Sequence, residues 1–280
     1  MRSEAAMLDL ILAFGRGDDN IRAVTLNGSR VDPRVVRDPY MDYDVVFHVR
    51  TVAPFIKDPG WSRAFGKIVI AQTPYFMETD GAKYPNFMSW YTDGSRTDIR
   101  VLPLDELADY LREDSLTKVL LDKDGLIPEL PEASDLIHHL KKPSQQKLKD
   151  SVNEFYWVSL YVTKALARGQ LIAAAEFLAI VRGELFRLLA WNAAHDEAYT
   201  INFGSHWKFL DGYLTSAEHL EIRSSYDLTD AAAIKNSLTR CRALFAKTLV
   251  EYCEKTAYSA TEDVEGILEL EKDWLDPLNR

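Results

Sequence analysis

Cysteine is scarce in this sequence, and its two cysteines are placed too far apart to pair. Cys241 and Cys253 are the only two among 280 residues, and both lie in one stretch with helical spacing. In a helix their backbones would be about 18 Å apart at about 1.5 Å per residue, which is beyond disulfide reach. The sequence therefore excludes a disulfide-stapled scaffold. Free thiols indicate a reducing compartment, so we expect a cytoplasmic protein.

Long hydrophobic runs are also missing. The most apolar stretch, residues 171–181, is short and contains Glu176, and the N-terminal apolar stretch contains Glu4 and Asp9. A membrane-spanning helix needs about 20 mostly apolar residues, so we expect neither a membrane span nor a signal peptide. Glycine (13) and proline (11) are at ordinary levels, which excludes a collagenous or disordered chain.

Positive charge is in deficit. The chain has 33 Lys and Arg against 43 Asp and Glu, a net charge of -10, and it has no basic block. Such a molecule repels polyanions, which argues against high-affinity binding of nucleic acid or of an anionic membrane surface. A cationic small molecule is a more natural ligand.

The hydrophobic patterns predict an α+β fold with two domains. An amphipathic helix at 7–14 precedes β-rich segments, at 21–26, 43–49, 67–72, 88–92 and 97–102. Asp93-Gly94 between the last two predicts a hairpin. A helix at 104–111 and a proline-rich boundary at 125–143 follow. Beyond the boundary only helical patterns occur, at 144–168, 171–195, 217–223, 230–256 and 262–274. We expect a mixed-sheet domain at 1–135 and an all-helical domain at 136–280.

Polar residues at the predicted strand ends form the most informative pattern. Gly28-Ser29-Arg30 follows the first strand, Asp42-Tyr43-Asp44 opens the second, and Asp98 lies in a later one. Side chains two apart on a strand share a face, with Cα atoms about 7 Å apart. Mg²⁺ takes such hard oxygen ligands, and three carboxylates can hold a metal pair for an in-line phosphoryl displacement. A glycine-serine loop can contact phosphate oxygens.

The spacing of these aspartates alone is also compatible with a purely structural role. The chain contains a second Asp-x-Asp, Asp122-Lys123-Asp124, which runs into Gly125 and is typical of a solvated turn. A second Gly-Ser-Arg, residues 94–96, is explained by its place in the hairpin. No zinc-protease, P-loop or serine-hydrolase motif is present.

The order of these parts resembles the polymerase-beta-like nucleotidyltransferase superfamily. The resemblance narrows to the aminoglycoside 6-adenylyltransferases, the streptomycin-modifying enzymes, through segments that extend over nearly the whole chain. These segments are VTLNGSR (24–30) with Asp42-Tyr43-Asp44, KVLLDKD (118–124), NEFYWVS (153–159), KALAR (164–168) and WKFL (207–210).

This resemblance implies a reaction and roles for individual residues. The reaction is transfer of AMP from Mg-ATP to a streptomycin hydroxyl at position 6, with pyrophosphate as leaving group, a reaction that confers antibiotic resistance. Residues 1–135 would be the nucleotidyltransferase domain, and 136–280 would bind substrate and nucleotide. Asp42 and Asp44 would ligate Mg²⁺, and Asp98 would be the third ligand or the general base. Gly28 and Ser29 would contact the nucleotide, with Arg30, Lys164 and Lys208 as countercharges for the triphosphate.

The residues that contact the acceptor are harder to assign. A guanidinium-bearing aminoglycoside favours carboxylates and flat polar aromatics, which the chain offers at Glu78, Asp80, Tyr84, Trp90, Tyr91 and Glu154. Glu154 and Trp90 are our candidates. Two alternatives stay open: the same fold acting on another acceptor, such as a lincosamide-type antibiotic or a metabolite, and a non-catalytic nucleotide-binding protein.

Overall fold

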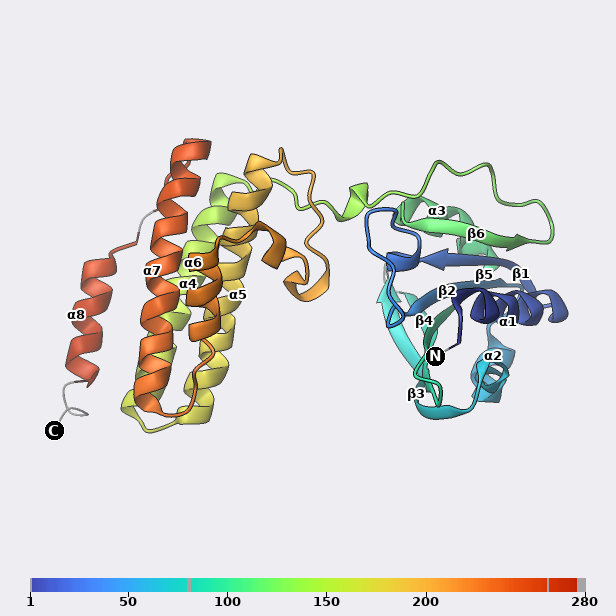
Figure 1. The fold of residues 1–280 in the computed structure, drawn as a ribbon, viewed down its shortest axis with the longest axis horizontal. Helices are drawn as coiled ribbons and strands as arrows, with labels where there is room; N and C mark the ends of the chain where they lie inside the picture. The colour runs from blue at the N-terminus through green and yellow to red at the C-terminus, as the bar shows by residue number, and fades with distance from the viewer. Residues whose placement is uncertain (1, 80–81, 261, 276–280) are drawn as a thin grey trace. The chain divides into compact units, whose positions relative to one another are not determined.

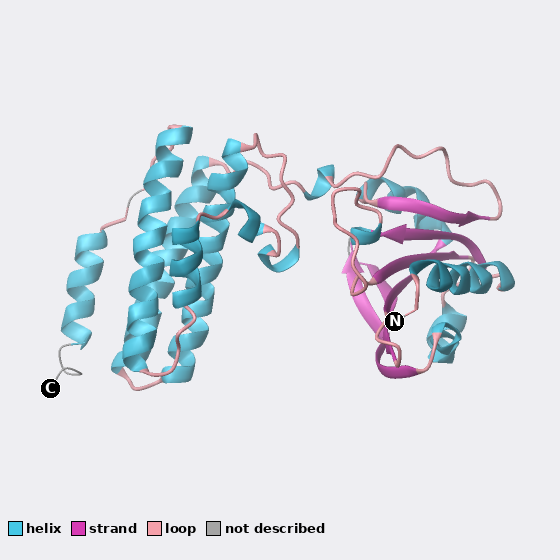
Figure 2. Ribbon diagram, viewed as in Figure 1, coloured by secondary structure: helices cyan, strands magenta, loops and turns pink. Residues whose placement is uncertain are grey.

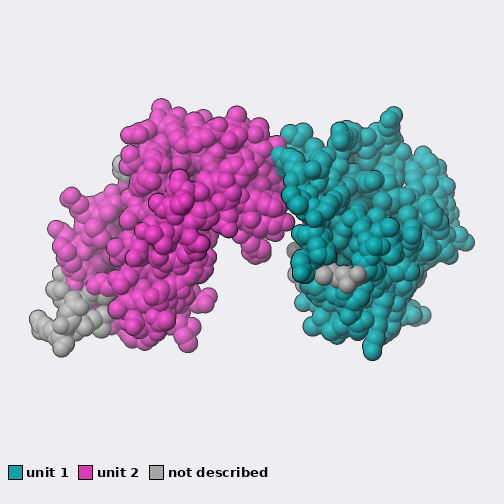
Figure 3. Space-filling model, in the orientation of Figure 1, with its two compact units in different colours: residues 1–137 teal, residues 138–280 magenta. Residues whose placement is uncertain are grey.

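The computed structural model describes residues 2–79, 82–260 and 262–275. The chain divides into two compact units, residues 1–137 and residues 138–280 (Figure 3). All strands of the described chain lie in the first unit, and the second is helical (Figure 2).

A single six-stranded mixed sheet forms the first unit (Figure 1). Its order is β3-β4-β5-β2-β1-β6, and only β2 and β5 pair in parallel. The strands are β1 (Ile21–Asn27), β2 (Tyr43–Val49), β3 (Ile68–Thr79), β4 (Ala82–Tyr91), β5 (Arg96–Pro103) and β6 (Thr117–Asp122). The parallel pair places the starts of two central strands at the same end of the sheet, next to the end of β1.

The two faces of this sheet differ in what covers them. Val45, Phe47 and Val49 of β2 point to the larger core, where three helical segments pack: α1 (Glu4–Gly17), α2 (Ala53–Lys57) and the 3-10 helix η2 (Pro59–Phe65). Val46 points the other way and packs with Tyr110 of α3 (Leu107–Glu113). Side chains alternate along a strand. Asp44 therefore shares its face with Val46, on the α3 side.

The helical unit is built around three long helices. These are α4 (Gln145–Ala167), α5 (Leu171–Asp196) and α7 (Ala231–Thr256). The shorter α6 (Ser216–Ser224) lies between α5 and α7 in the chain, and α8 (Val264–Leu275) follows α7. Ser144 and Asp230 cap α4 and α7 by accepting backbone N–H groups. In its core, Phe155 and Phe245 stack with ring centroids 3.7 Å apart.

The predicted α+β class is confirmed, and most predicted elements are present. The sequence patterns missed β6 and underestimated β3 and β4. β6 is a short edge strand that pairs only with β1, so it has one hydrogen-bonded neighbour. Cys241 and Cys253 both lie in α7 and are unpaired thiols. Within the described ranges, none of the helices combines the length and apolarity needed to cross a bilayer.

Candidate active site

The three predicted carboxylates lie at one end of the sheet. Asp44 in β2 is the register partner of Asp98 in the parallel strand β5, and Asp42 immediately precedes β2. Register partners point to the same face, as do residues two apart on a strand. Asp44 and Asp98 therefore lie side by side on the α3 face. Asp42 is tied to the same group by the contacts of Arg96.

Arg96 bridges two of these carboxylates. Its Nη1 donates to Asp42 Oδ2 at 2.7 Å, and its Nη2 donates to Asp98 Oδ2 at 2.9 Å. The second oxygen of Asp98, Oδ1, accepts a hydrogen bond from Asn86 Nδ2 at 3.0 Å. These bonds orient Asp98 through both of its oxygens. The side chains of Arg96, Asp42 and Asp98 are 26%, 32% and 20% exposed, so the cluster is accessible to solvent.

Gly28 brings the backbone close to this cluster. It adopts a left-handed conformation with φ +69°, and a Cβ at this position would lie 2.5 Å from Asp44 Oδ2. Only glycine therefore allows both the turn and the close approach. Ser29 follows in the short 3-10 helix η1 (Gly28–Arg30) and is partly exposed. The predicted Gly-Ser loop and the Asp44 carboxylate are thus direct neighbours.

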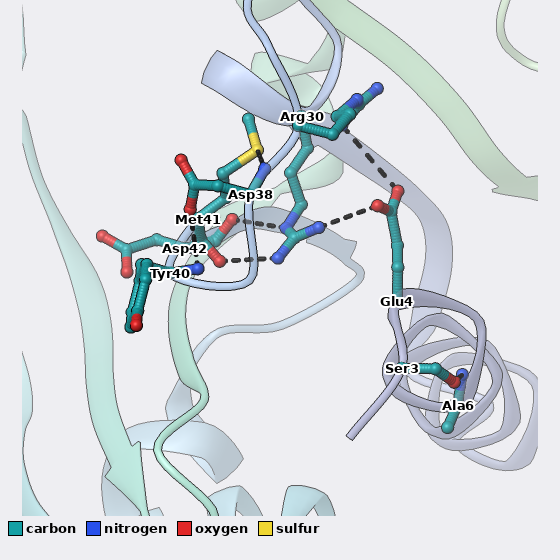
Figure 4. A network of polar contacts seen from close by, with 9 residues as sticks. Ser3, Glu4, Ala6, Arg30, Asp38, Tyr40, Met41 and Asp42 are labelled. Atoms are coloured by element: carbon teal, nitrogen blue, oxygen red, sulfur yellow. Dashed lines mark hydrogen bonds and ion pairs between the residues drawn. The ribbon is translucent and has the colours of Figure 1, made fainter. Parts of the chain in front are cut away.

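Arg30 directs its guanidinium at the chain's own oxygens (Figure 4). Its Nε donates to Asp42 O at 2.8 Å, its Nη2 to Met41 O at 2.6 Å, and its Nη1 to Glu4 Oε2 at 2.9 Å. The guanidinium also lies 3.7 Å from the ring centroid of Tyr43, and the side chain is only 4% exposed. These contacts make Arg30 an anchor for the backbone that leads into β2 and so for Asp42.

Asn27 fixes the other side of the loop. Its Nδ2 donates to Thr117 Oγ1 in β6 at 2.9 Å, and its Oδ1 accepts from the hydroxyl of Tyr110 in α3. The last residue of β1 is therefore held by two other elements just before the chain turns at Gly28. This local rigidity sets the position from which the loop approaches the carboxylates.

A buried histidine extends this network. His48 is fully buried, and its Nε2 lies 3.3 Å from Thr25 Oγ1, which is 2.8 Å from the hydroxyl of Tyr110. Burial, together with the nearby charge of Arg100, lowers the pKa of His48 to about 4. The imidazole is therefore neutral at physiological pH and acts as a polar part of the core beneath the site.

Trp90 lies beside the arginine that bridges the carboxylates. It is the register partner of Arg96 in the β4–β5 pair, and the guanidinium carbon lies 5.7 Å from its ring centroid. Trp90 is 46% exposed. The structure thus brings this predicted substrate residue into the neighbourhood of Asp42 and Asp98.

Two further aromatic candidates on β4, Tyr91 and Tyr84, have partners other than the three carboxylates. Tyr91 is buried, and its hydroxyl shares a 2.8 Å hydrogen bond with Thr97 Oγ1, so it belongs to the core on the opposite face. A hydrogen bond to Glu106 raises the pKa of Tyr84 to about 12. Asp80 and the side chain of Glu78 lie outside the described residues.

Glu154 and Lys164 share one exposed face of α4. They are ten positions apart, about 15 Å along the helix, and Trp157 and Tyr161 lie between them at helical spacing. These two aromatics are 54% and 40% exposed, and Trp157 Nε1 donates to the Tyr161 hydroxyl at 2.9 Å. Lys164 lines a hollow of about 280 Å³ together with Tyr161, Arg168 and Phe177. We call the surface formed by Glu154, Trp157, Tyr161 and Lys164 the α4 stripe.

Lys208 lies in a turn of the helical unit. It is exposed, and its Nζ lies 4.9 Å from the ring centroid of Phe209. The two preceding residues, His206 and Trp207, have φ values of 55° and 60°. Left-handed backbone is costly for such residues and is concentrated at functional sites, which keeps Lys208 a candidate.

The donor set at the sheet end has the chemistry of a cation site. Its ligating groups would be hard carboxylate oxygens, and the guanidinium of Arg96 is a cation already bound to Asp42 and Asp98. Over the described part of the chain, no group of three or more His, Cys, Asp or Glu side chains is arranged closely enough to hold a metal ion. The residue types fit Mg²⁺, while their present arrangement is organised around an arginine.

Sequence reasoning missed the role of Arg96. We attributed Gly94-Ser95-Arg96 entirely to the hairpin, and the structure shows that this is correct for the turn but incomplete for Arg96. The available signal was its position two residues before Asp98 on one strand, which places both side chains on one face. The exposed aromatics of the α4 stripe were also missed, although Trp157 lies in a segment that carries the resemblance.

Comparisons with known proteins identify the family of the chain. The family model described as streptomycin adenylyltransferase matches residues 1–269. The chain is 36% identical over 272 residues to the aminoglycoside 6-adenylyltransferase of Bacillus subtilis (strain 168). The aligned region covers 95% of this chain and 96% of that protein. It is 34% identical over 254 residues to the protein of that name from Campylobacter jejuni, covering 90% and 88%.

The chain also matches a solved structure. The crystal structure of an aminoglycoside 6-adenyltransferase from Bacillus subtilis has 32% sequence identity and a TM-score of 0.49, and the match covers 98% of this chain and 99% of that one. The family match and the curated relatives establish the relationship independently of this score. The chain belongs to the streptomycin adenylyltransferase family.

Proposed function

We propose that this protein transfers AMP from Mg-ATP to the hydroxyl at position 6 of streptomycin, releases pyrophosphate, and thereby confers resistance. The observation that carries the proposal is the convergence of Gly28, Asp42, Asp44 and Asp98 at one end of the sheet. Membership of an aminoglycoside-adenylylating family supports it. Free thiols support a cytoplasmic location.

The carboxylates and the glycine loop would bind the metal and the triphosphate of ATP. Asp42, Asp44 and Asp98 would hold Mg²⁺, which stabilises charge on phosphoryl oxygens during an in-line displacement. Gly28 and Ser29 would contact phosphate oxygens beside Asp44, since no side chain at Gly28 blocks their approach. In the helical unit, Lys164 and Lys208 would add countercharge to the nucleotide.

The acceptor would be recognised as a cation. The chain carries a net charge of -10, which favours a cationic guest over nucleic acid or an anionic membrane. Glu154 offers a carboxylate, and Trp90 offers an exposed ring of the kind that attracts guanidinium groups. Trp157 belongs with Glu154 on the α4 stripe and would extend the acceptor surface.

Carboxylate substitution tests the proposal directly. Asp44→Asn should reduce streptomycin-dependent pyrophosphate release by about 10³-fold or more, because a metal ligand contributes several kcal/mol to the transition state. Asp109→Asn is the matched control, since Asp109 is 61% exposed in α3 and pairs only at the surface with Arg112. Equal activity of the two variants would refute the assignment. An acceptor other than streptomycin would show itself as activity with another antibiotic and none with streptomycin.

A further inference from the structure

Arg96 stands out because one guanidinium serves two carboxylates of the proposed metal site. Its two terminal nitrogens contact Asp42 and Asp98 separately, at 2.7 Å and 2.9 Å. Each contact is a charge-assisted hydrogen bond, the strong class of polar interaction in proteins. The planar fork of arginine suits such bridging, whereas the point charge of lysine does not.

The surroundings of Arg96 hold its guanidinium at this position. Arg96 lies two residues before Asp98 on β5, so both side chains are on one face. Trp90, its register partner on β4, has its ring centroid 5.7 Å from the guanidinium carbon. Asn86 donates to Asp98 Oδ1 at 3.0 Å and so turns Asp98 Oδ2 toward Arg96. Residues of the neighbouring strand β4 therefore help to hold the Arg96 bridge, in addition to the attraction between the guanidinium and the two carboxylates.

A guanidinium in this position and a divalent cation oppose each other. Both are attracted to the same two carboxylates, Asp42 and Asp98, and two cations a few ångströms apart repel. A cation bound by Asp42, Asp44 and Asp98 must therefore displace the hydrogen bonds of Arg96 or bind despite repulsion by the guanidinium charge. The absence of a three-carboxylate cluster among the described residues is consistent with carboxylates that are spaced by an arginine.

We propose that Arg96 is an internal counter-cation that competes with the divalent metal for Asp42 and Asp98. It holds the two carboxylates in place before metal binds, and its two ion pairs open as metal is taken up. Arg96 is then a positioning residue that sets metal affinity. This inference rests on the proposed function, because it assigns the metal to these carboxylates.

Metal binding measured without nucleotide tests the competition. Mn²⁺ is titrated into the full chain, with free Mn²⁺ read by electron paramagnetic resonance, for wild type and Arg96→Gln. We expect Arg96→Gln to bind Mn²⁺ about tenfold more tightly, the factor that corresponds to the loss of about 1.4 kcal/mol of competing ion pairing. Arg96→Lys should lie between the two, because lysine keeps the charge but loses the fork.

Arg22 provides the control for the loss of one positive charge. Arg22→Gln removes the same charge from another ion-paired arginine of the first unit, whose partner is Asp124, and should leave Mn²⁺ affinity unchanged. Unchanged or weaker Mn²⁺ binding in Arg96→Gln would overturn the competition while leaving the metal assignment intact. If Mn²⁺ bound to neither wild type nor Arg96→Gln, both the metal assignment and this inference would fail. If Arg96→Gln did not fold, Arg96→Lys alone must still bind Mn²⁺ more tightly than wild type.

Discussion

Substitution of Gly28 separates the conformational role of the loop from its role beside Asp44. Gly28 has φ +69°, and a Cβ there would lie 2.5 Å from Asp44 Oδ2. Gly125 is a matched control in the same unit, because it has φ +65° but no atom within 4 Å of an added Cβ. Gly28→Ala and Gly125→Ala therefore share the left-handed backbone cost, about 1–2 kcal/mol.

The two variants should differ in activity far more than in stability. Ordinary contact begins at 3.4 Å, so the Asp44 carboxylate must withdraw by roughly 1 Å, and a displacement of that size can cost about 100-fold in rate. The carboxylate is the end of a side chain and can rotate away, which keeps the extra stability cost small. We expect kcat/KM for pyrophosphate release to fall about 100-fold in Gly28→Ala and to stay near wild type in Gly125→Ala.

Thermal unfolding and steady-state kinetics of both variants provide the measurement. Similar melting temperatures with a large difference in kcat/KM would agree with the geometry. If Gly28→Ala retained the activity of Gly125→Ala, the close approach of the loop to Asp44 would have no catalytic importance, and the reasoning would be refuted.

Three further predictions concern the supporting structure. Arg30→Met should destabilise the protein by about 2–4 kcal/mol, because it leaves the Met41 and Asp42 carbonyls without their donor; an unchanged melting temperature with a raised KM for ATP would instead indicate nucleotide contact. His48→Asn should reduce the loss of folding stability at acidic pH. The pKa of His48 in the folded state, about 4, lies below its value in the unfolded chain, so the wild type loses about 2 kcal/mol of unfolding free energy between pH 7 and pH 5 that the variant retains. Equal decreases in melting temperature for the two proteins over this pH range would contradict this. Phe245→Ala should cost about 3–5 kcal/mol, since its buried ring stacks on another ring; chemical denaturation with a loss below 1 kcal/mol, roughly, would contradict the packing.

Local patterns predicted most of the fold because each is a property of consecutive residues. The Val- and Phe-rich composition of residues 43–49 identified β2, and the Asp-Gly turn identified the hairpin between β4 and β5. β6 was missed because residues 117–122 are short and were recognised only as part of a resemblance. The turn expected at Asp122 does follow it, since Asp122 accepts the backbone N–H of Ile127 at 2.8 Å.

The site was predictable only where its geometry follows from strand register. Asp42, Asp44 and Asp98 could be grouped from spacing and strand order, although spacing left their roles open. The bridge from Arg96 to Asp42 joins residues 54 positions apart, and no local pattern encodes such a contact. Arg30 was predicted to contact the triphosphate because it follows Gly-Ser, and this stays a prediction. Its burial against Tyr43 depends on the path of the chain between β1 and β2.

The most direct test of the account is the mass of streptomycin after incubation with the full chain, ATP and Mg²⁺. The account predicts a product that carries one added adenylyl group, formed together with pyrophosphate and absent when Asp44→Asn replaces the wild type. Unmodified streptomycin in the presence of a folded, ATP-binding protein would contradict it.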